Sequence, residues 1–175
     1  SDLLEVTWIK QGALDPMEIH VADLVQTILR SIEHAPGYDS VTFRLDIPER
    51  YQVVSDIKML NSILQNLIFN AVKYHREEGE SKWVAITVTD FAKHARISIR
   101  DNGPGIPIVA QDRLFDMFYR ASNKSKGSGL GLYIVKTSIE KMGGTVVLHS
   151  TEGIGTDFVI ELPKMALPPK PGAEA

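Results

Sequence analysis

Alternating apolar and polar residues predict the strands of this chain, because successive side chains of a strand point to opposite faces. Met17, Ile19 and Val21, for example, alternate with Glu18 and His20. The pattern predicts strands over residues 17–21, 41–45, 83–90, 96–101, 146–149 and 157–162. The third and fourth of these strands, and the last two, are close enough in sequence to form hairpins.

Apolar residues at helical spacing predict four helices. Leu4 and Trp8 indicate the end of a helix whose body lies upstream, and Asp56 is placed to cap a long one. The predicted helices cover residues 3–11, about 22–34, 57–74 and 129–142, the last ending at Gly143 and Gly144. Because the helices segregate from mostly antiparallel strands, the fold class expected is α+β, a two-layer sandwich.

Composition narrows the classes of partner. The chain has 175 residues, a net charge of −3 and no cysteine. Without a cationic surface or a long apolar run, we expect neither nucleic-acid binding nor direct membrane contact. We interpret the chain as a piece of a longer protein: residues 1–12 as the end of a helix or linker, 13–164 as one domain, and 165–175 as a disordered Pro-rich tail.

One helix carries polar residues that are unusual for a solvated surface. At about 100° per residue, Asn66, Asn70 and Lys73 fall within roughly 60° of the helix circumference, beside an apolar stripe. Asn is a poor helix former, so its repeated use suggests a role for the amide oxygen. Such oxygens suit Mg²⁺, and a nearby Lys suits phosphate. An ordinary solvated face remains the alternative.

Two glycine-rich segments offer further candidate chemistry. Residues 101–107 place a carboxylate, Asp101, at the end of a strand, followed by glycines that let a flat ring approach the backbone. Residues 127–132 place glycines before a helix, where backbone N–H groups attract anions. Neither segment is a P-loop or a dinucleotide fingerprint. The alternatives are an ordinary turn for the first segment and a flexible hinge for the second.

An aromatic and basic segment, residues 113–124, lies between the two glycine-rich segments. Large apolar groups flanked by Arg and Lys, and bounded by Gly, are typical of a mobile lid that offers cations to phosphates. A small amphipathic helix of the core is the alternative.

The order of the motifs resembles the catalytic ATP-binding domain of sensor histidine kinases. These belong to the Bergerat-type superfamily shared with DNA gyrase, the heat-shock chaperone ATPase and mismatch-repair MutL proteins. The resemblance runs from about residue 16 to residue 163. Its motifs are Asn66-x-x-x-Asn70-Ala71-x-Lys73-Tyr74, Asp101-x-Gly103-x-Gly105-Ile106, Phe115-x-x-Phe118, Gly127-x-Gly129-Leu130-Gly131-Leu132 and Gly153-x-Gly155-Thr156.

The resemblance implies a role for each motif. Asp101 would bind the adenine amino group, and Asn66 and Asn70 would serve Mg²⁺, while Phe115 and Phe118 would dock the lid. The implied catalytic residues are Asn66, Asn70 and Lys73. The implied nucleotide-binding residues are Asn70, Lys73, Tyr74, Asp101, Gly103, Gly105, Ile106, Arg120, Lys124, Gly127, Ser128, Gly129, Leu130, Gly131, Leu132 and Thr156.

The implied function is transfer of the γ-phosphate of Mg–ATP to a histidine outside this chain. Hydrolytic members of the superfamily have Glu where this chain has Asn66, and an amide cannot act as a base. The phosphoacceptor His motif is absent from the sequence. The implied partners are therefore a dimerisation and phosphoacceptor domain and, indirectly, a response regulator. The implied location of this chain is the cytoplasm. An ATPase module, an anti-sigma-type serine kinase and a degenerate nucleotide-binding scaffold are the alternatives.

Overall fold

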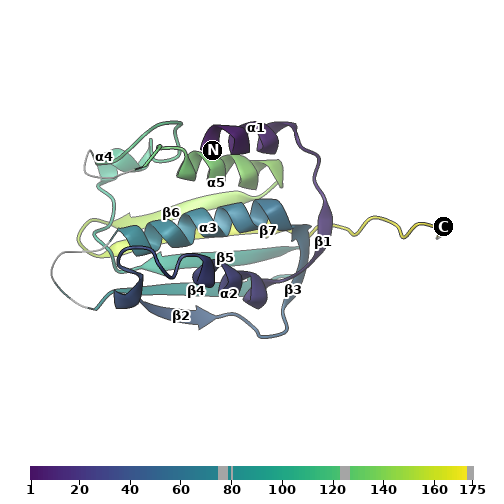
Figure 1. The fold of residues 1–175 in the computed structure, drawn as a ribbon, viewed down its shortest axis with the longest axis horizontal. Coiled ribbons are helices and arrows are strands. Elements are labelled where there is room, and N and C mark those ends of the chain that lie inside the picture. The colour runs from purple at the N-terminus through teal and green to yellow at the C-terminus, as the bar shows by residue number, and fades with distance from the viewer. Residues whose placement is uncertain (75–78, 80, 123–126, 173–175) are drawn as a thin grey trace.

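The computed structural model describes residues 1–74, 79, 81–122 and 127–172. Helices and strands alternate irregularly along the chain (Figure 1). The elements are α1 (Asp2–Gln11), β1 (Pro16–His20), α2 (Val21–Ser31), the 3₁₀ helix η1 (Tyr38–Ser40), β2 (Thr42–Asp46), β3 (Gln52–Asp56), α3 (Ile57–Lys73), β4 (Trp83–Asp90), β5 (His94–Asp101), α4 (Ile108–Gln111), α5 (Gly131–Lys141), β6 (Thr145–Thr151) and β7 (Gly155–Pro163).

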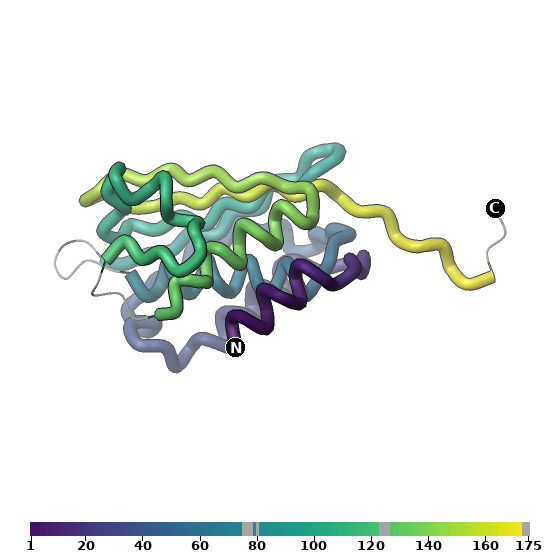
Figure 2. Tube along the Cα trace, turned by 90° about the horizontal axis from the view of Figure 1, so that it is seen from above, coloured from purple at the N-terminus to yellow at the C-terminus, as the bar shows by residue number. Residues whose placement is uncertain are grey.

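The main sheet has five strands in the order β2-β4-β5-β7-β6. Only the β2–β4 pair is parallel, and the three other pairs are antiparallel. β1 and β3 form a separate antiparallel pair. The helices lie on one side of the main sheet, as the view of the molecule from above in Figure 2 shows. The predicted α+β two-layer sandwich is therefore confirmed.

The long helix α3 forms the centre of the helical layer. Its apolar stripe is fully buried, including Ile63, Leu64, Leu67 and Ile68 at 0% exposure. The Asp56 side chain accepts a hydrogen bond from the Met59 amide at 3.0 Å, which is the predicted N-cap and stabilises the helix by about 1 kcal/mol. Burial of one face leaves the adjoining polar residues of α3 at the edge of the core.

Helix α1 packs against α5 and the edge of α3. Val6 and Ile9 are buried in the common core, so the end of this segment is attached to the body of the domain. The Lys141 ammonium group donates hydrogen bonds to the carbonyl oxygens of Lys10, at 3.2 Å, and of Gly12. These contacts hold the C-terminal end of α1 beside the C-terminal end of α5.

The sequence pattern missed β3. Only Val53 and Ser55 alternate as buried residues of this strand, and the segment leads directly into the Asp56 cap, so the pattern did not single it out. The tail has no helix or strand over residues 164–172, and its predicted disorder stays a prediction. Among the described residues, no helix is both long enough and apolar enough to cross a membrane.

Candidate functional site

The polar residues of α3 face the glycine-rich segment before α5. A Cβ at Gly131 would lie 2.9 Å from the Asn66 side-chain oxygen, and a Cβ at Gly127 would lie 3.6 Å from the Lys73 ammonium nitrogen. Both side chains are half-buried, as is Asn70 between them. The structure thus brings together an amide oxygen, a cation and a glycine-rich backbone segment, which suits an anion and its counterion.

The orientation of the Asn66 amide follows from a single hydrogen bond. Its Nδ2 group donates to the Ser62 carbonyl oxygen at 2.8 Å, one turn earlier in α3. The amide oxygen is thereby directed toward Gly131. An oxygen held on a rigid helix is the kind of ligand that a hard cation such as Mg²⁺ takes.

Backbone contacts fix the glycine-rich segment itself. Gly129 has a φ of 72°, and its carbonyl oxygen accepts a hydrogen bond from the Phe118 amide at 3.0 Å. The Ser128 hydroxyl donates to the Asp2 carboxylate of α1 and accepts from the Leu130 amide at 3.3 Å. Leu130 is buried, whereas Leu132 packs partly buried against the core. The two leucines therefore anchor the segment and leave its amides at the site.

A buried carboxylate marks the second part of the site. Asp101 ends β5 with 9% exposure, and its Oδ1 accepts a hydrogen bond from the Gly103 amide at 2.7 Å. Burial raises the pKa of Asp101, and that amide together with the nearby Lys82 ammonium group opposes the rise. Such a carboxylate can accept a hydrogen bond from a ligand amino group.

The loop after β5 lies against the hairpin of β6 and β7. Gly105 has a φ of 70°, and a Cβ there would lie only 2.1 Å from the Thr151 carbonyl oxygen. The Ile106 amide donates to the Ser150 hydroxyl at 2.8 Å, and that hydroxyl lies 3.0 Å from the Thr156 hydroxyl. Thr156 in turn pairs with Asp101 across the sheet. These contacts place Ile106 and Thr156 beside Asp101.

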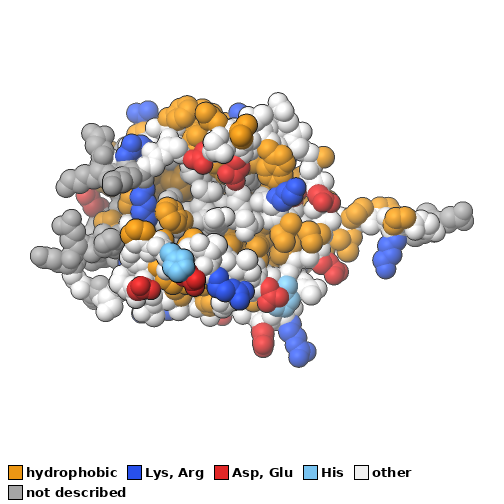
Figure 3. Space-filling model, in the orientation of Figure 1, with side chains coloured by type: hydrophobic (Ala, Val, Ile, Leu, Met, Phe, Trp, Pro, Cys, Tyr) orange, Lys and Arg blue, Asp and Glu red, His pale blue; other side chains and the backbone are white. Residues whose placement is uncertain are grey.

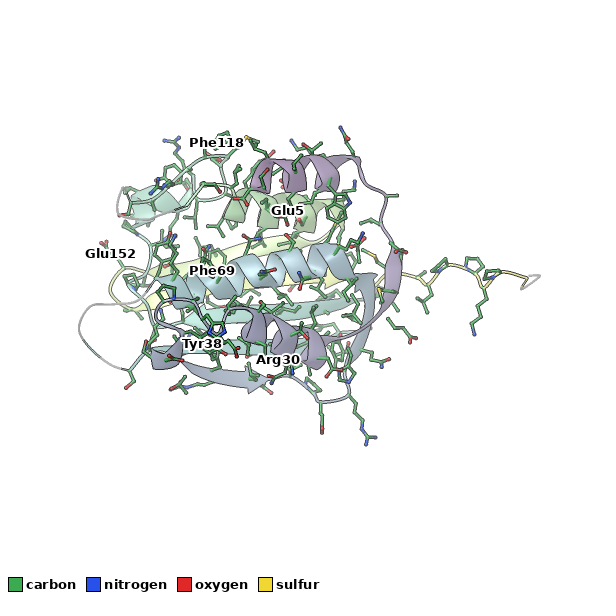
Figure 4. The ribbon with its side chains drawn as sticks, in the orientation of Figure 1. Glu5, Arg30, Tyr38, Phe69, Phe118 and Glu152 are labelled. Atoms are coloured by element: carbon green, nitrogen blue, oxygen red, sulfur yellow. The ribbon has the colours of Figure 1, made fainter. Side chains whose placement is uncertain are left out.

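The segment predicted to form the lid, residues 113–124, is described up to residue 122. The Phe115 ring packs edge-on against Phe158 of β7, with ring centroids 6.1 Å apart, and so docks this segment on the core. The Phe118 ring does not dock: it is 58% exposed at the outer side of the lid (Figure 4), and its residue has a positive φ of 64°. Phe118 contacts the body through its backbone instead. Arg120 is exposed, and Lys124 lies outside the described residues.

A groove of about 570 Å³ adjoins the site between α1 and α3. Its lining includes acidic groups of α1, and Glu5 points from α1 toward α3, where it accepts a hydrogen bond from the Ser62 hydroxyl (Figure 4). Acidic side chains also lie beneath the apolar groups of the upper edge in Figure 3. The groove reaches the site at Asn66, and its lining residues are Asp2, Glu5, Trp8, Lys58, Asn61, Ser62, Gln65, Asn66 and Phe69.

Three residues near Asp101 and Ile106 were missed by the sequence pattern. Ser150 and Gln111 hold the loop around Ile106: the Gln111 amide group donates to the Ile106 carbonyl oxygen at 2.9 Å and to that of Ser150 at 3.2 Å. Neither has a sequence signal. Lys82 has one, because the register of the predicted β4–β5 hairpin places it opposite Gly103.

Comparison with known protein families gives a match over most of the chain. A family model described as "Histidine kinase-, DNA gyrase B-, and HSP90-like ATPase" matches residues 55–166. The chain is 34% identical over 171 residues to the sensor protein kinase WalK of Staphylococcus epidermidis, covering 93% of this chain and 27% of that kinase. It is 30% identical over 148 residues to the heme sensor protein HssS of Staphylococcus saprophyticus, covering 85% of this chain and 31% of that protein. The chain thus spans less than a third of these relatives.

Solved structures with the same fold include two proteins of similar size. The catalytic domain of the histidine kinase ThkA superposes with a TM-score of 0.72 at 27% identity, over 86% of this chain and 98% of that domain. The mycobacterial sensor histidine kinase MprB superposes with a TM-score of 0.72 at 26% identity, over 85% of this chain and 97% of that structure.

Proposed function

The chain belongs to the family of histidine kinase-, DNA gyrase B- and HSP90-like ATPases, and we propose that it binds Mg–ATP and transfers the γ-phosphate to a histidine of a separate dimerisation and phosphoacceptor domain. The observation that carries the proposal is the position of the Asn66 side-chain amide: it projects from α3 and places its oxygen against the glycine-rich segment before α5. In the proposed two-component pathway, a response regulator receives the phosphate from that histidine. Because the proposed reaction consumes ATP, we also propose that this domain lies in the cytoplasm.

The base pocket and the phosphate site are proposed to lie at opposite ends of the nucleotide. Asp101 accepts a hydrogen bond from the adenine amino group, with Gly103, Gly105, Ile106 and Thr156 around the ring. The proposal is supported by the burial of Asp101 and by the contacts that join Ile106 to Thr156. At the other end, backbone groups of residues 127–132 surround the phosphates, and Lys73, Tyr74, Arg120 and Lys124 supply cations and polar contacts.

The residues present fit a magnesium ion. Asn66 and Asn70 offer amide oxygens from one rigid helix, and the hydrogen bond to Ser62 leaves the Asn66 oxygen on the phosphate side. When bound, Mg²⁺ neutralises phosphate charge. The chain contributes by holding the phosphates in line for an incoming nucleophile, with Lys73 as a fixed positive charge.

The amide at position 66 favours phosphate transfer over hydrolysis. Water is a poor nucleophile unless a base removes its proton, and Asn66 has no basic group. A neutral imidazole attacks through its own lone pair and needs no such base. We therefore propose that the acceptor is a histidine.

Mixing the chain with a separate phosphoacceptor domain tests this function. We expect the chain alone to bind ATP with little phosphate release, and the mixture to form a phosphoprotein slowly, because no covalent tether raises the effective concentration. The product should be labile in acid and stable in base. Radiolabelled ATP, with and without the acceptor domain, gives the measurement. Rapid phosphate release by the chain alone would favour an ATPase, and an acid-stable phosphoprotein would favour a serine kinase.

Binding of Mg–ATP should order the lid. Arg120 and the Phe118 ring are exposed in this structure, and the proposed phosphates give the cation a partner. We expect slower amide hydrogen exchange over residues 107–122 when Mg–ATP is added, and no change in the β4–β5 turn, residues 91–93. Equal exchange in both states over 107–122 would contradict a nucleotide-ordered lid.

A further inference from the structure

Lys82 is a buried lysine outside the motifs of the proposed site. It stands directly before β4 and is 9% exposed, although lysine is almost never buried without a partner. Its ammonium group donates a hydrogen bond to the Tyr74 carbonyl oxygen at the end of α3 and lies 3.9 Å from Asp101 Oδ1 at the end of β5. Lys82 therefore joins the helix of the phosphate site to the strand of the base pocket.

The three groups converge on Gly103, which has no side chain to keep them apart. A Cβ at Gly103 would lie 2.7 Å from Asp101 Oδ1, 2.7 Å from the Tyr74 carbonyl oxygen and 3.0 Å from the Lys82 nitrogen. The Gly103 amide also donates to Asp101 Oδ1 at 2.7 Å. Oδ1 is thus held from two sides. Among the described residues, the other oxygen, Oδ2, accepts no hydrogen bond.

We propose that Lys82 is a positioning residue for base recognition: together with the Gly103 amide it occupies one oxygen of Asp101, and so directs the other oxygen to the adenine amino group. The inference rests on the proposed function, because it assumes that Asp101 receives the base. Lys82 itself touches no nucleotide atom. Its effect on recognition of the base acts through Asp101.

The charge of Lys82 has a second consequence. Burial raises the pKa of Asp101, Asp157 on β7 raises it further, and the Gly103 amide and Lys82 lower it. Only the ionised carboxylate presents two acceptor oxygens, so affinity for adenine falls as the pH drops through the pKa of Asp101. Loss of the Lys82 charge moves that fall to higher pH.

The test compares ATP with its 6-deamino analogue, purine riboside triphosphate. Calorimetric titration of Lys82→Met should show about tenfold weaker binding of ATP near neutral pH, the usual cost of disturbing a hydrogen bond to a charged group, and a larger loss in mild acid. Affinity for the analogue, which lacks the amino group, should match that of the unmodified chain. Lys164→Met is the matched control: Lys164 pairs with Asp90 at 2.8 Å, far along the sheet, and should change neither affinity.

A second variant separates charge from structural support. Lys82→Gln keeps a donor for the Tyr74 carbonyl oxygen but removes the charge, so it should fold and reproduce the selective, pH-dependent loss of ATP affinity. Wild-type behaviour of Lys82→Gln, or equal loss of ATP and analogue, would overturn the role of Lys82 and leave the proposed function standing. Equal affinity of the unmodified chain for both nucleotides would overturn the Asp101 contact as well.

Discussion

Asp101→Asn should weaken ATP binding by about 1–3 kcal/mol, or about five- to 150-fold in affinity. The amide keeps one acceptor oxygen but places a donor where the second oxygen stood. That donor meets either the adenine amino group or the Gly103 amide, both of which are donors themselves. Calorimetric titration with Mg–ATP gives the affinity, and thermal unfolding shows whether the variant keeps its fold.

Asp90→Asn is the matched control for this prediction. Asp90 ends the neighbouring strand β4, and its carboxylate pairs with Lys164 at 2.8 Å and accepts a hydrogen bond from Tyr51 at 3.0 Å. Those partners lower its pKa, chiefly through Lys164, and none of them belongs to the proposed site. ATP affinity should therefore be unchanged. Equal losses in the two variants would refute the assignment of Asp101.

Gly105→Ala should remove both nucleotide binding and a large part of the stability. Gly105 has a φ of 70°, and the new Cβ would lie 2.1 Å from the Thr151 carbonyl oxygen. Left-handed strain and overpacking together cost about 2–5 kcal/mol. The loop would have to move away from β6, and the Ile106 contact with Ser150 would break. Urea unfolding and ATP titration are the two measurements.

Gly153→Ala isolates the strain from the steric contact. Gly153 has a φ of 81°, yet a Cβ there would meet nothing within 4 Å. Only the conformational cost of about 1–2 kcal/mol should appear, with ATP affinity unchanged. If the two glycine variants lose equal stability, the contact between Gly105 and Thr151 does not constrain the base pocket.

Helix and strand periodicity predicted most of the fold. The buried stripe of α3 and the hairpin turns are local signals, and each leads to an element whose bounds lie within a few residues of those observed. The order of the motifs predicted the family, which the match over residues 55–166 confirms. The nucleotide contacts of the motif residues stay a prediction.

Features that depend on distant partners could not be predicted in the same way. Strand β3 pairs with β1, more than thirty residues earlier, and has too few alternating residues of its own to be recognised. Ser150 and Gln111 matter only because folding brings them to the loop around Ile106. The exposed Phe118 ring belongs to a residue with a positive φ, which no side-chain pattern reports.

The ladder between β5 and β7 closes the longest loop of the main sheet, since Asp101 pairs with Thr156 while the lid, α5 and β6 lie between them in the chain. The entropy lost in closing a loop grows with the logarithm of its length, so doubling a flexible segment costs only ~0.6 kcal/mol. Insertions or deletions in the lid therefore cost the folded state little, while Asp101 and Thr156 stay paired. Homologues can therefore differ in the length of the lid without a change in the shape of the proposed base pocket.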